Sequence, residues 1–258
     1  MGDDKILDGM IFDGLWDPYS NVHMGHCGDA CAKEYGISRE VQDAYAKESF
    51  RRALLAQKEL LFADEIEPVL IPQRKGEPLQ VAIDEGPGKA DISKMGALKP
   101  AFGQDGTITA ANASSINDGA SALLLASDAA LARYGLESMA RIAGYAGAAQ
   151  APDRFTTAPS LAIDRLLEKR KLQSNNVDLY EINEAFAVVA LVAMKLNHLH
   201  AEQVNVHGGA VALGHPIGAS GARILTTLVH AMRNRKAKRG IASICIGGGE
   251  AIALCIER

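Results

Sequence analysis

The chain has 258 residues and a formal net charge of −4, with 48% hydrophobic and 22% charged residues. This composition is typical of a globular protein and excludes a disordered polyelectrolyte. The net charge provides no general attraction for nucleic acid or for an anionic membrane. The longest apolar run, residues 185–194, is too short to span a bilayer. We therefore expect neither nucleic acid nor a membrane as a partner.

The four cysteines are too few for a disulfide scaffold at this length; they are Cys27, Cys31, Cys245 and Cys255. The first pair could form a metal site with His23 and His26, but small side chains near a loop are the favoured interpretation, and we expect no metal. The first residues lack the basic and apolar regions of a secretory signal. Free thiols without such a signal favour the reducing environment of the cytoplasm.

The first 111 residues contain small elements without an obvious core of their own. An apolar stripe at helical spacing predicts a helix over 38–61, with Ser38 as its N-cap. Short strands are expected at 66–72 and 79–83, flanked by Pro and Gly, and the Gly-rich segment 84–96 is expected to be a loop. This pattern indicates a lid or insertion rather than a free-standing domain.

Strands and helices alternate through the remainder of the chain. Strands are predicted at 121–126, 140–149, 177–182, 204–206, 242–246 and 251–256. Helices are predicted at 127–134, 159–170, 184–196 and 219–233. This alternation predicts a layered α/β fold with helices on both faces of the sheet.

Three segments place an isolated reactive residue among small ones. Asn183 follows a predicted strand, where α/β folds often carry functional residues, although capping the next helix alone would explain it. His215 lies on a Gly-rich loop, where it can accept a proton or donate to an oxyanion. Cys245 precedes three glycines and is either a reactive thiol or a small buried hydrophobe, which is the favoured interpretation for Cys255.

Five basic residues crowd the end of the predicted helix 219–233; they are Arg233, Arg235, Lys236, Lys238 and Arg239. They could attract phosphate groups. Cations at a helix C-terminus, favoured by the helix dipole and by solvent, are the preferred interpretation.

The three reactive segments together resemble the motifs of the thiolases, the acetyl-CoA acetyltransferase class. The matching motifs are N-E-A-F (183–186), G-G-A-x-x-x-G-H-P-x-G-x-S-G-A-R (208–223) and C-x-G-G-G (245–249). Residues 23–25, 99–102 and 112–120 match further thiolase segments in the same order. The resemblance implies a thiolase-like layered α/β/α fold with an inserted α+β lid. It divides the chain into a lid contacting coenzyme A (1–111), the tail of a first α/β half (112–138) and a C-terminal α/β domain (139–258).

The resemblance also implies roles for particular residues. His215 would activate the acyl-accepting cysteine and, with a water held by Asn183, stabilise the thioester enolate. Cys245 would shuttle the proton at the α-carbon, and the N–H of Gly247 would contribute to the oxyanion hole. Ser114 would bind the pantetheine of coenzyme A in a channel lined by His23, Met24, Ala101, Phe102, Ala185 and Phe186. Coenzyme A and acetyl-CoA would be substrates, with no cofactor permanently bound.

The chain departs from the thiolase pattern at its N-terminal side. The part that carries the acyl-accepting cysteine is expected to be absent and the first α/β half incomplete. Cys27 and Cys31 are not expected to substitute, because they follow residues 23–25 within the lid and lack the small-residue setting of the nucleophile. Gly28-Asp29-Ala30 replaces the usual Ala-Glu-Asn, and His207 replaces a frequent Asn. No Arg is evident for the nucleotide end of coenzyme A, for which Lys89 or Arg74 could substitute.

The expected function is therefore acetyl-CoA C-acetyltransferase activity, by Claisen condensation of thioesters or thiolysis of acetoacetyl-CoA and other 3-ketoacyl-CoA substrates. The chain is expected to be inactive alone and to act as a homo-oligomer or with a companion chain that supplies the missing part. A non-catalytic module that binds coenzyme A or acyl-CoA, or a truncated remnant, is the alternative.

Overall fold

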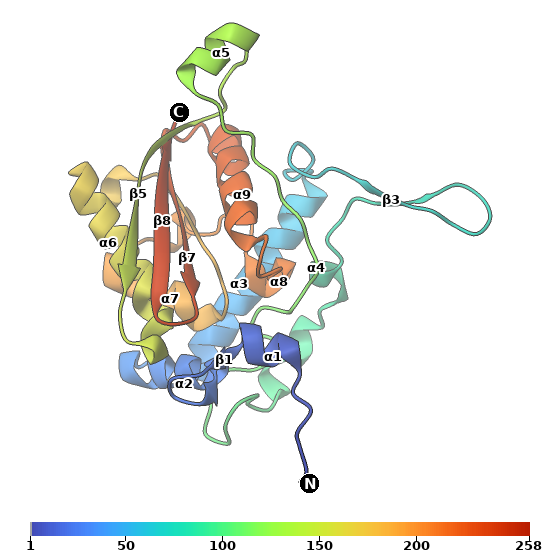
Figure 1. The fold of residues 1–258 in the computed structure, drawn as a ribbon, viewed down its shortest axis with the longest axis vertical. Helices are drawn as coiled ribbons and strands as arrows, with labels where there is room; N and C mark the ends of the chain where they lie inside the picture. Colours follow the sequence, from blue (N-terminus) through green and yellow to red (C-terminus); the bar gives the residue numbers. More distant parts are fainter. Residues whose placement is uncertain (1) are drawn as a thin grey trace.

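A four-stranded sheet organises the computed structural model, which describes residues 2–258 (Figure 1). The strand order is β5-β8-β7-β6, formed by β5 (Arg141–Ala149), β8 (Glu250–Glu257), β7 (Arg239–Ile246) and β6 (Leu179–Ile182). In this sheet β6 and β7 are parallel, whereas β8 is antiparallel to both β7 and β5. Ile182 pairs with Ser243, so the carboxyl ends of β6 and β7 lie side by side.

Helices cover both faces of this sheet; they are α6 (Ala158–Arg170), α7 (Ala187–Asn197) and α9 (Ser220–Arg235). Successive side chains of a strand point to opposite faces. Accordingly Tyr180 and Ile182 pack in the cluster that contains residues of α6 and α7, whereas Leu179 packs with Leu228 of α9. The predicted layered α/β fold is confirmed.

The first 111 residues form short elements around two longer helices. They are α1 (Gly9–Gly14), β1 (Trp16–Asp17), β2 (Val22–His23), α2 (Met24–Tyr35), α3 (Arg39–Lys58), β3 (Val69–Ile71), β4 (Leu79–Val81), α4 (Gly86–Lys89) and a 3₁₀ helix (Ile92–Ala97). Cys27 of α2 is buried with Val188 of α7, and Phe50 of α3 is buried with Ala187 and Val211. The lid segment thus shares its core with the C-terminal elements.

The long helix and the two short strands predicted in the lid segment are confirmed, although each is shorter than its predicted range. Ser38 caps α3, accepting a hydrogen bond from the Val41 N–H at 3.4 Å. β3 and β4 pair as an antiparallel hairpin that projects from the body of the molecule (Figure 1). Every residue of its two strands is exposed.

Two predicted strands are wrong. Residues 121–126 form no strand, and Leu124 is 88% exposed, because none of the described strands lies beside this apolar run to complete a ladder. Residues 204–206 make only isolated bridges, in which Val204 pairs with Tyr180 and Val206 with Gly208.

Three further predictions need correction. Segment 84–96, predicted to be a loop, contains α4 and most of the 3₁₀ helix. Helix α2 was not predicted. The helix expected from residue 184 begins at Ala187, because a bridge between Ala113 and Phe186 holds the preceding residues extended. Asn183 therefore lies outside the helix, and its interpretation as a helix cap is wrong.

The remaining elements are short and connect those above. They are α5 (Asp128–Tyr134), α8 (Ala210–Leu213) and three 3₁₀ helices (Pro152–Thr157, Ser174–Asn176 and Ala201–Gln203). No helix within residues 2–258 is long and apolar enough to cross a membrane.

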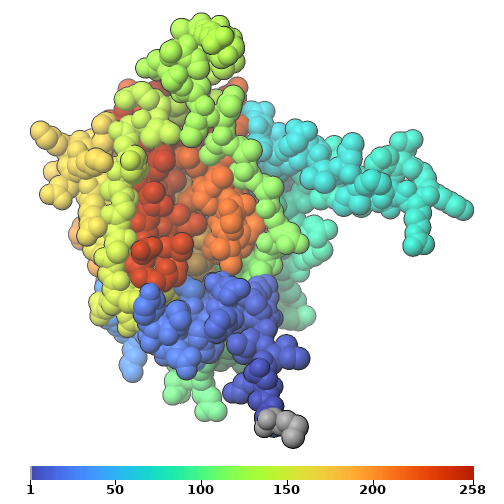
Figure 2. All heavy atoms as spheres, viewed as in Figure 1, coloured from blue at the N-terminus to red at the C-terminus, as the bar shows by residue number. Residues whose placement is uncertain are grey.

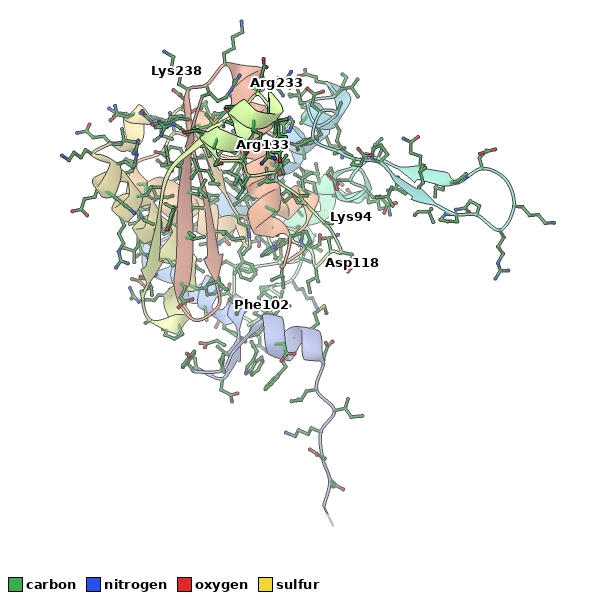
Figure 3. The ribbon with its side chains drawn as sticks, turned by 45° about the horizontal axis from the view of Figure 1, so that its top comes forward. Lys94, Phe102, Asp118, Arg133, Arg233 and Lys238 are labelled. Carbon is green, nitrogen blue, oxygen red and sulfur yellow. The ribbon has the colours of Figure 1, made fainter. Side chains whose placement is uncertain are left out.

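The basic residues near the end of α9 lie where a helix dipole favours cations. Arg233 and Arg235 occupy the last turn, and Lys236 ends the helix in a left-handed conformation. Figure 3 shows Arg233 and Lys238 at the end of the molecule opposite Phe102. The basic group is therefore remote from the aromatic side chains described below.

Candidate functional site

His215 lies on the loop that joins α8 to α9. Its backbone N–H donates to Ser115 O at 2.9 Å, and the neighbouring Ile116 forms a parallel bridge with it. Gly214 has φ +95°, and a Cβ there would overlap the Asn117 side chain. Only glycine satisfies both conditions, which explains why this position carries no side chain.

The structure brings His215 and Asn183 together from segments 32 residues apart. Asn183 Nδ2 lies 3.2 Å from His215 Nε2, and Asn183 is 1% exposed at the end of β6. Its backbone N–H donates to Ser243 O at 3.0 Å, which extends the ladder between β6 and β7 by one residue. The parallel strand pair therefore fixes the amide that faces the imidazole.

The contact between Ser220 and His215 Nδ1 is the basis for assigning the proton of the ring. Ser220 Oγ lies 2.5 Å from His215 Nδ1 and donates its own hydrogen to Pro216 O at 3.0 Å. We assign the single hydroxyl hydrogen to Pro216 O, and in this assignment the hydroxyl oxygen accepts from Nδ1–H. Nε2 then keeps its lone pair and accepts from the Asn183 amide.

The protein environment keeps the imidazole neutral. Burial, and then the positive charge of Arg223, lower the pKa of His215 from 6.5 to about 4. At neutral pH the ring therefore presents an unprotonated Nε2 to the site. Such a group accepts a proton or, once protonated, donates to a developing negative charge.

Cys245 lies near the end of β7, at the same sheet edge as Asn183. Burial raises the pKa of this thiol to about 12, so it is protonated at neutral pH. Gly247 follows in the exposed turn between β7 and β8, and the Met24 side chain approaches it. Gly249 has φ +83°, and a Cβ there would overlap the carbonyl oxygens of Gln150 and Ala151.

Aromatic side chains from three segments meet beside this edge. The His23 and Phe102 rings stack with centroids 4.5 Å apart, and Phe102 meets Phe186 edge-on at 6.1 Å. Cys245 and Met24 pack against the same apolar cluster as Phe186. His23, Met24 and Phe102 of the lid segment, which are predicted to line the coenzyme A channel, thus lie beside Phe186 of the N-E-A-F motif.

The other predicted channel residues are engaged by the backbone. Ser114 donates both its N–H, at 3.1 Å, and its hydroxyl, at 2.9 Å, to Ala185 O. The Ala101 N–H donates to Ile108 O at 2.8 Å. The Ser114 hydroxyl must therefore turn away from Ala185 before it can donate to another group, although it retains acceptor capacity.

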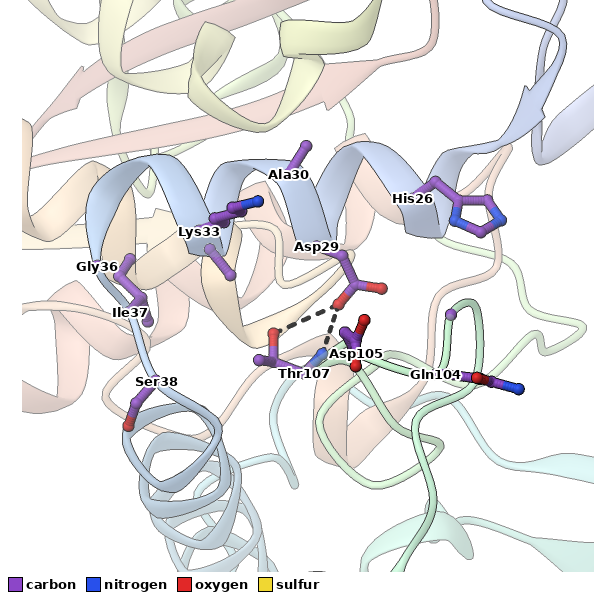
Figure 4. Close-up of a pocket in the computed structure, with 13 residues that line it drawn as sticks. His26, Asp29, Ala30, Lys33, Gly36, Ile37, Ser38, Gln104, Asp105 and Thr107 are labelled. Atoms are coloured by element: carbon purple, nitrogen blue, oxygen red, sulfur yellow. Dashed lines mark hydrogen bonds between the residues drawn. The ribbon is translucent and has the colours of Figure 1, made fainter.

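Two hollows lie outside this group of side chains. One, of about 640 Å³, lies between α2 and the loop 103–107 (Figure 4). Asp29 of α2 lines this hollow and accepts hydrogen bonds from the N–H groups of Thr107 and Ile108. The second, of about 350 Å³, lies against the His215 loop and is lined by residues 117–121 and 216–219 together with Ala222. Figure 2 shows that the β7, β8 and α8–α9 region, in orange and red, is open to one face of the molecule.

Lys89 and Arg74, the possible substitutes for an Arg at the nucleotide end of coenzyme A, lie in different segments of the structure. Lys89 forms an ion pair with Glu85 at 2.6 Å, and both side chains are exposed. Arg74 lies in the connection between β3 and β4.

Two other departures from the thiolase pattern are packed inside the fold. Gly28 faces Ile108 so closely that a larger residue would force the Ile108 side chain to move. His207 packs edge-on against Phe62.

Sequence reasoning missed two contributors to the site. Ser220 belongs to the same motif as His215, at a spacing of five residues, which was the available signal. Glu184 is fully buried and accepts from Tyr45, Ser49, Asn205 and the Val211 N–H at 2.7–3.0 Å. No local pattern marked these partners, because all four lie on other segments of the chain.

Family comparisons agree with this arrangement. The thiolase C-terminal domain model matches residues 136–258, and the thiolase N-terminal domain model matches residues 1–129. The chain belongs to the thiolase family. The match to the N-terminal model does not support the expectation that the N-terminal part of the family is absent.

Individual relatives extend the family assignment. Acetyl-CoA acetyltransferase 1 of Arabidopsis thaliana is 53% identical over 259 residues, which cover 100% of this thiolase chain and 62% of the relative. The Bacillus anthracis acetyl-CoA acetyltransferase has a TM-score of 0.95 at 40% identity, and Acat5 thiolase from Ascaris suum, solved with coenzyme A, has a TM-score of 0.90 at 42% identity. Each alignment covers 100% of this chain and 65% of the solved one. The chain spans less than two thirds of the length of these relatives.

Proposed function

We propose that this thiolase chain is an acetyl-CoA C-acetyltransferase polypeptide, which condenses acetyl-CoA or cleaves acetoacetyl-CoA and related 3-ketoacyl-CoA substrates. The contact between Asn183 Nδ2 and His215 Nε2 carries the proposal, because it joins two thiolase motifs into one polar pair. Relatives named acetyl-CoA acetyltransferase, and a solved relative in complex with coenzyme A, support the substrate class.

The geometry suits stabilisation of a thioester enolate. Once its Nε2 has taken up a proton, the imidazole of His215 can donate, together with the amide of Asn183, to the oxygen where negative charge develops. Cys245 is a protonated thiol, so it can give its proton to the α-carbon when the enolate of acetyl-CoA leaves during thiolysis. The N–H of Gly247, in the exposed turn, would complete the oxyanion hole for the tetrahedral intermediate.

Coenzyme A would lie along the aromatic cluster. His23, Met24, Phe102 and Phe186 provide the apolar wall, with Ala101 and Ala185 between them, and Ser114 would contact the pantetheine. The protein binds coenzyme A as a substrate in this proposal, with no permanently held cofactor.

The acyl-accepting thiol is, in this proposal, none of the four cysteines described. Burial raises the pKa of Cys27 to about 11, and also raises the pKa values of Cys31 and Cys255. A nucleophilic cysteine requires a lowered pKa or an adjacent base. We infer that a companion chain or an oligomeric assembly supplies the nucleophile in the cytoplasm, and that residues 1–111, 112–138 and 139–258 serve as the lid, the tail of the first half and the C-terminal domain.

The test separates enolate chemistry from acyl transfer. The chain is incubated with acetyl-CoA in D₂O, and deuterium entry into the acetyl methyl group is followed by NMR while intact-protein mass reports acylation. We expect methyl exchange that increases with pH, as the Cys245 thiolate that removes the α-proton becomes populated, without a stable acetyl mass gain, and loss of exchange in Cys245→Ala and Asn183→Ala. Exchange no faster than in buffer would contradict the proposal.

A non-catalytic module for coenzyme A is the second candidate, favoured by the raised pKa values of all four thiols. Calorimetric titration with coenzyme A distinguishes it. Binding of the same affinity in the wild type and Cys245→Ala, combined with an absence of methyl exchange, would establish this alternative.

A further inference from the structure

Asn205 lies against the outer side of β6, which is an edge strand of the described sheet. Val204 forms a parallel bridge with Tyr180, and the Asn205 N–H donates to Tyr180 O at 2.9 Å. Asn205 then has φ +47°, which turns the main chain away from β6. Its side chain continues the ladder instead: Oδ1 accepts from the Ile182 N–H and Nδ2 donates to Ile182 O, both at 2.8 Å. An Asn side-chain amide carries the same donor and acceptor as a peptide unit, so it can take the place of a strand neighbour.

The neighbours of Asn205 fix the orientation of its amide. The Ile182 N–H is a donor and requires Oδ1, whereas Ile182 O and Glu184 Oε1 are acceptors at 2.8 Å and require Nδ2. Tyr45 Oη of α3 lies 3.1 Å from the same Nδ2 and donates to Glu184 Oε1 at 2.7 Å. Asn205 is 2% exposed, so loss of its amide would leave buried polar groups unpaired.

These contacts hold the chain on both sides of Asn183. Asn205 bonds to Ile182, which precedes Asn183, and to Glu184, which follows it. The Asn183 side chain itself contacts His215 Nε2 at 3.2 Å, and its Oδ1 is buried without a hydrogen-bond partner among residues 2–258. The direction of this amide toward His215 therefore depends on where the neighbouring main chain is held.

The backbone of Asn205 also begins the segment that leads to His215. Its carbonyl oxygen accepts from the Gly208 N–H at 2.9 Å, which closes a turn. The next residue, Gly209, donates its N–H to Ser49 Oγ of α3 at 3.0 Å, and α8 and the His215 loop follow directly. A single residue thus contacts the strand that carries Asn183 and starts the turn before the loop that carries His215.

We propose that Asn205 is a positioning residue for the His215–Asn183 pair: its side-chain amide serves as the strand neighbour that the end of β6 lacks, and so sets how the Asn183 amide meets the imidazole. Asn205 acts through Ile182 and Glu184, which it contacts on either side of Asn183. The relevance of this arrangement to catalysis rests on the proposed function, whereas its effect on the pair does not.

The test follows the ¹⁵N resonance of His215 Nε2 by NMR in the ligand-free chain at neutral pH, assigned with His215→Gln. Asn205→Asp keeps the oxygen that accepts from Ile182 and replaces the donating nitrogen, whereas Asn205→Gly removes the whole amide. Both replacements tolerate a left-handed backbone. In both variants we expect the resonance to move toward its position in Asn183→Ala, and the Asn183 N–H to exchange with solvent about tenfold faster.

Asn197→Asp is the matched control. Asn197 is 4% exposed at the end of α7, and its Nδ2 also donates to one backbone carbonyl and one carboxyl group, Ser160 O at 3.2 Å and Asp164 Oδ1 at 2.7 Å. The control loses the same kind of buried donor from a different helix. It should leave the Nε2 resonance of His215 at its wild-type position.

An unchanged Nε2 resonance in folded Asn205→Asp and Asn205→Gly would overturn the proposal. An equal change in Asn197→Asp would also overturn it, because the effect would then follow from the loss of any buried amide. If circular dichroism shows that neither Asn205 variant folds, Tyr45→Phe decides, since it removes one contact of the Asn205 amide; a wild-type resonance in this variant would again overturn the proposal. The measurement involves no turnover, so failure of the proposed acyl-transfer chemistry would leave its outcome interpretable.

Discussion

Single atoms decide the chemical state of the site. With the hydrogen of Ser220 assigned to Pro216 O, the hydroxyl oxygen accepts from His215 Nδ1. The tautomer of His215 thus follows from a residue five positions along the chain. The Asn183 amide then faces an unprotonated Nε2 rather than an N–H group.

Ser220→Ala should release this tautomer. We expect loss of the fixed Nδ1–H form and about 1 kcal/mol of stability, because one side-chain hydrogen bond to the imidazole disappears. ¹⁵N chemical shifts of the His215 ring nitrogens measure the tautomer, and urea unfolding measures the stability. Ser220→Thr retains the hydroxyl and is the control; a wild-type tautomer ratio in Ser220→Ala would show that another group determines it.

At the scale of elements, one carboxyl group joins three parts of the fold. Glu184 follows Asn183 and accepts from Tyr45 and Ser49 of α3, from Asn205 and from the Val211 N–H of α8. Gly209 lies against this carboxyl group so closely that a Cβ would overlap it. The position of Asn183 therefore depends on contacts made by the adjacent residue.

Glu184→Gln tests this connection. The amide replaces one accepting oxygen by a donor that faces existing donors, so we expect a destabilisation of about 2–3 kcal/mol in urea unfolding. Glu48→Gln provides a matched control, because Glu48 also accepts from two side chains but is 38% exposed and should cost less than about 1 kcal/mol. Equal costs in the two variants would contradict a special role for Glu184.

At the scale of the whole molecule, buried ionisable groups make stability depend on pH in opposing directions. The pKa values of His207 and His215 are lowered to about 4, so their contribution is lost as pH falls from 6.5 toward 4. Glu65 and Glu181 have pKa values raised from 4.5 to about 7 and about 8. Their contribution is present at low pH and is lost as pH rises through these values.

Glu181→Gln isolates one of these contributions. The free energy of unfolding of this variant, relative to the wild type, should increase from pH 5 to pH 8 by on the order of 3 kcal/mol, because the wild type alone bears the cost of a buried carboxyl resisting ionisation. Urea unfolding at each pH measures the difference, in which the contributions of both histidines cancel. A difference independent of pH would show that Glu181 ionises normally in the folded protein.

The sequence by itself determined the layered fold, most helices and the family to which the chain belongs. Periodicity reports which face of an element is apolar, and that information is local. It located α3 with its Ser38 cap and the two strands around the three glycines after Cys245. The motifs around Asn183, His215 and Cys245 were sufficient to indicate the thiolase family, which the family comparisons confirm.

Only the tertiary structure decided which residues act on one another. Leu124 and Leu125 lie in an apolar run that predicts a buried strand, yet both are exposed, because a strand needs a neighbour that local pattern cannot supply. Asn183 satisfies the pattern of a helix cap but faces His215, because the bridge at Phe186 delays the helix. Glu184 meets Tyr45 and Ser49 of α3, and long-range packing alone brings these groups together.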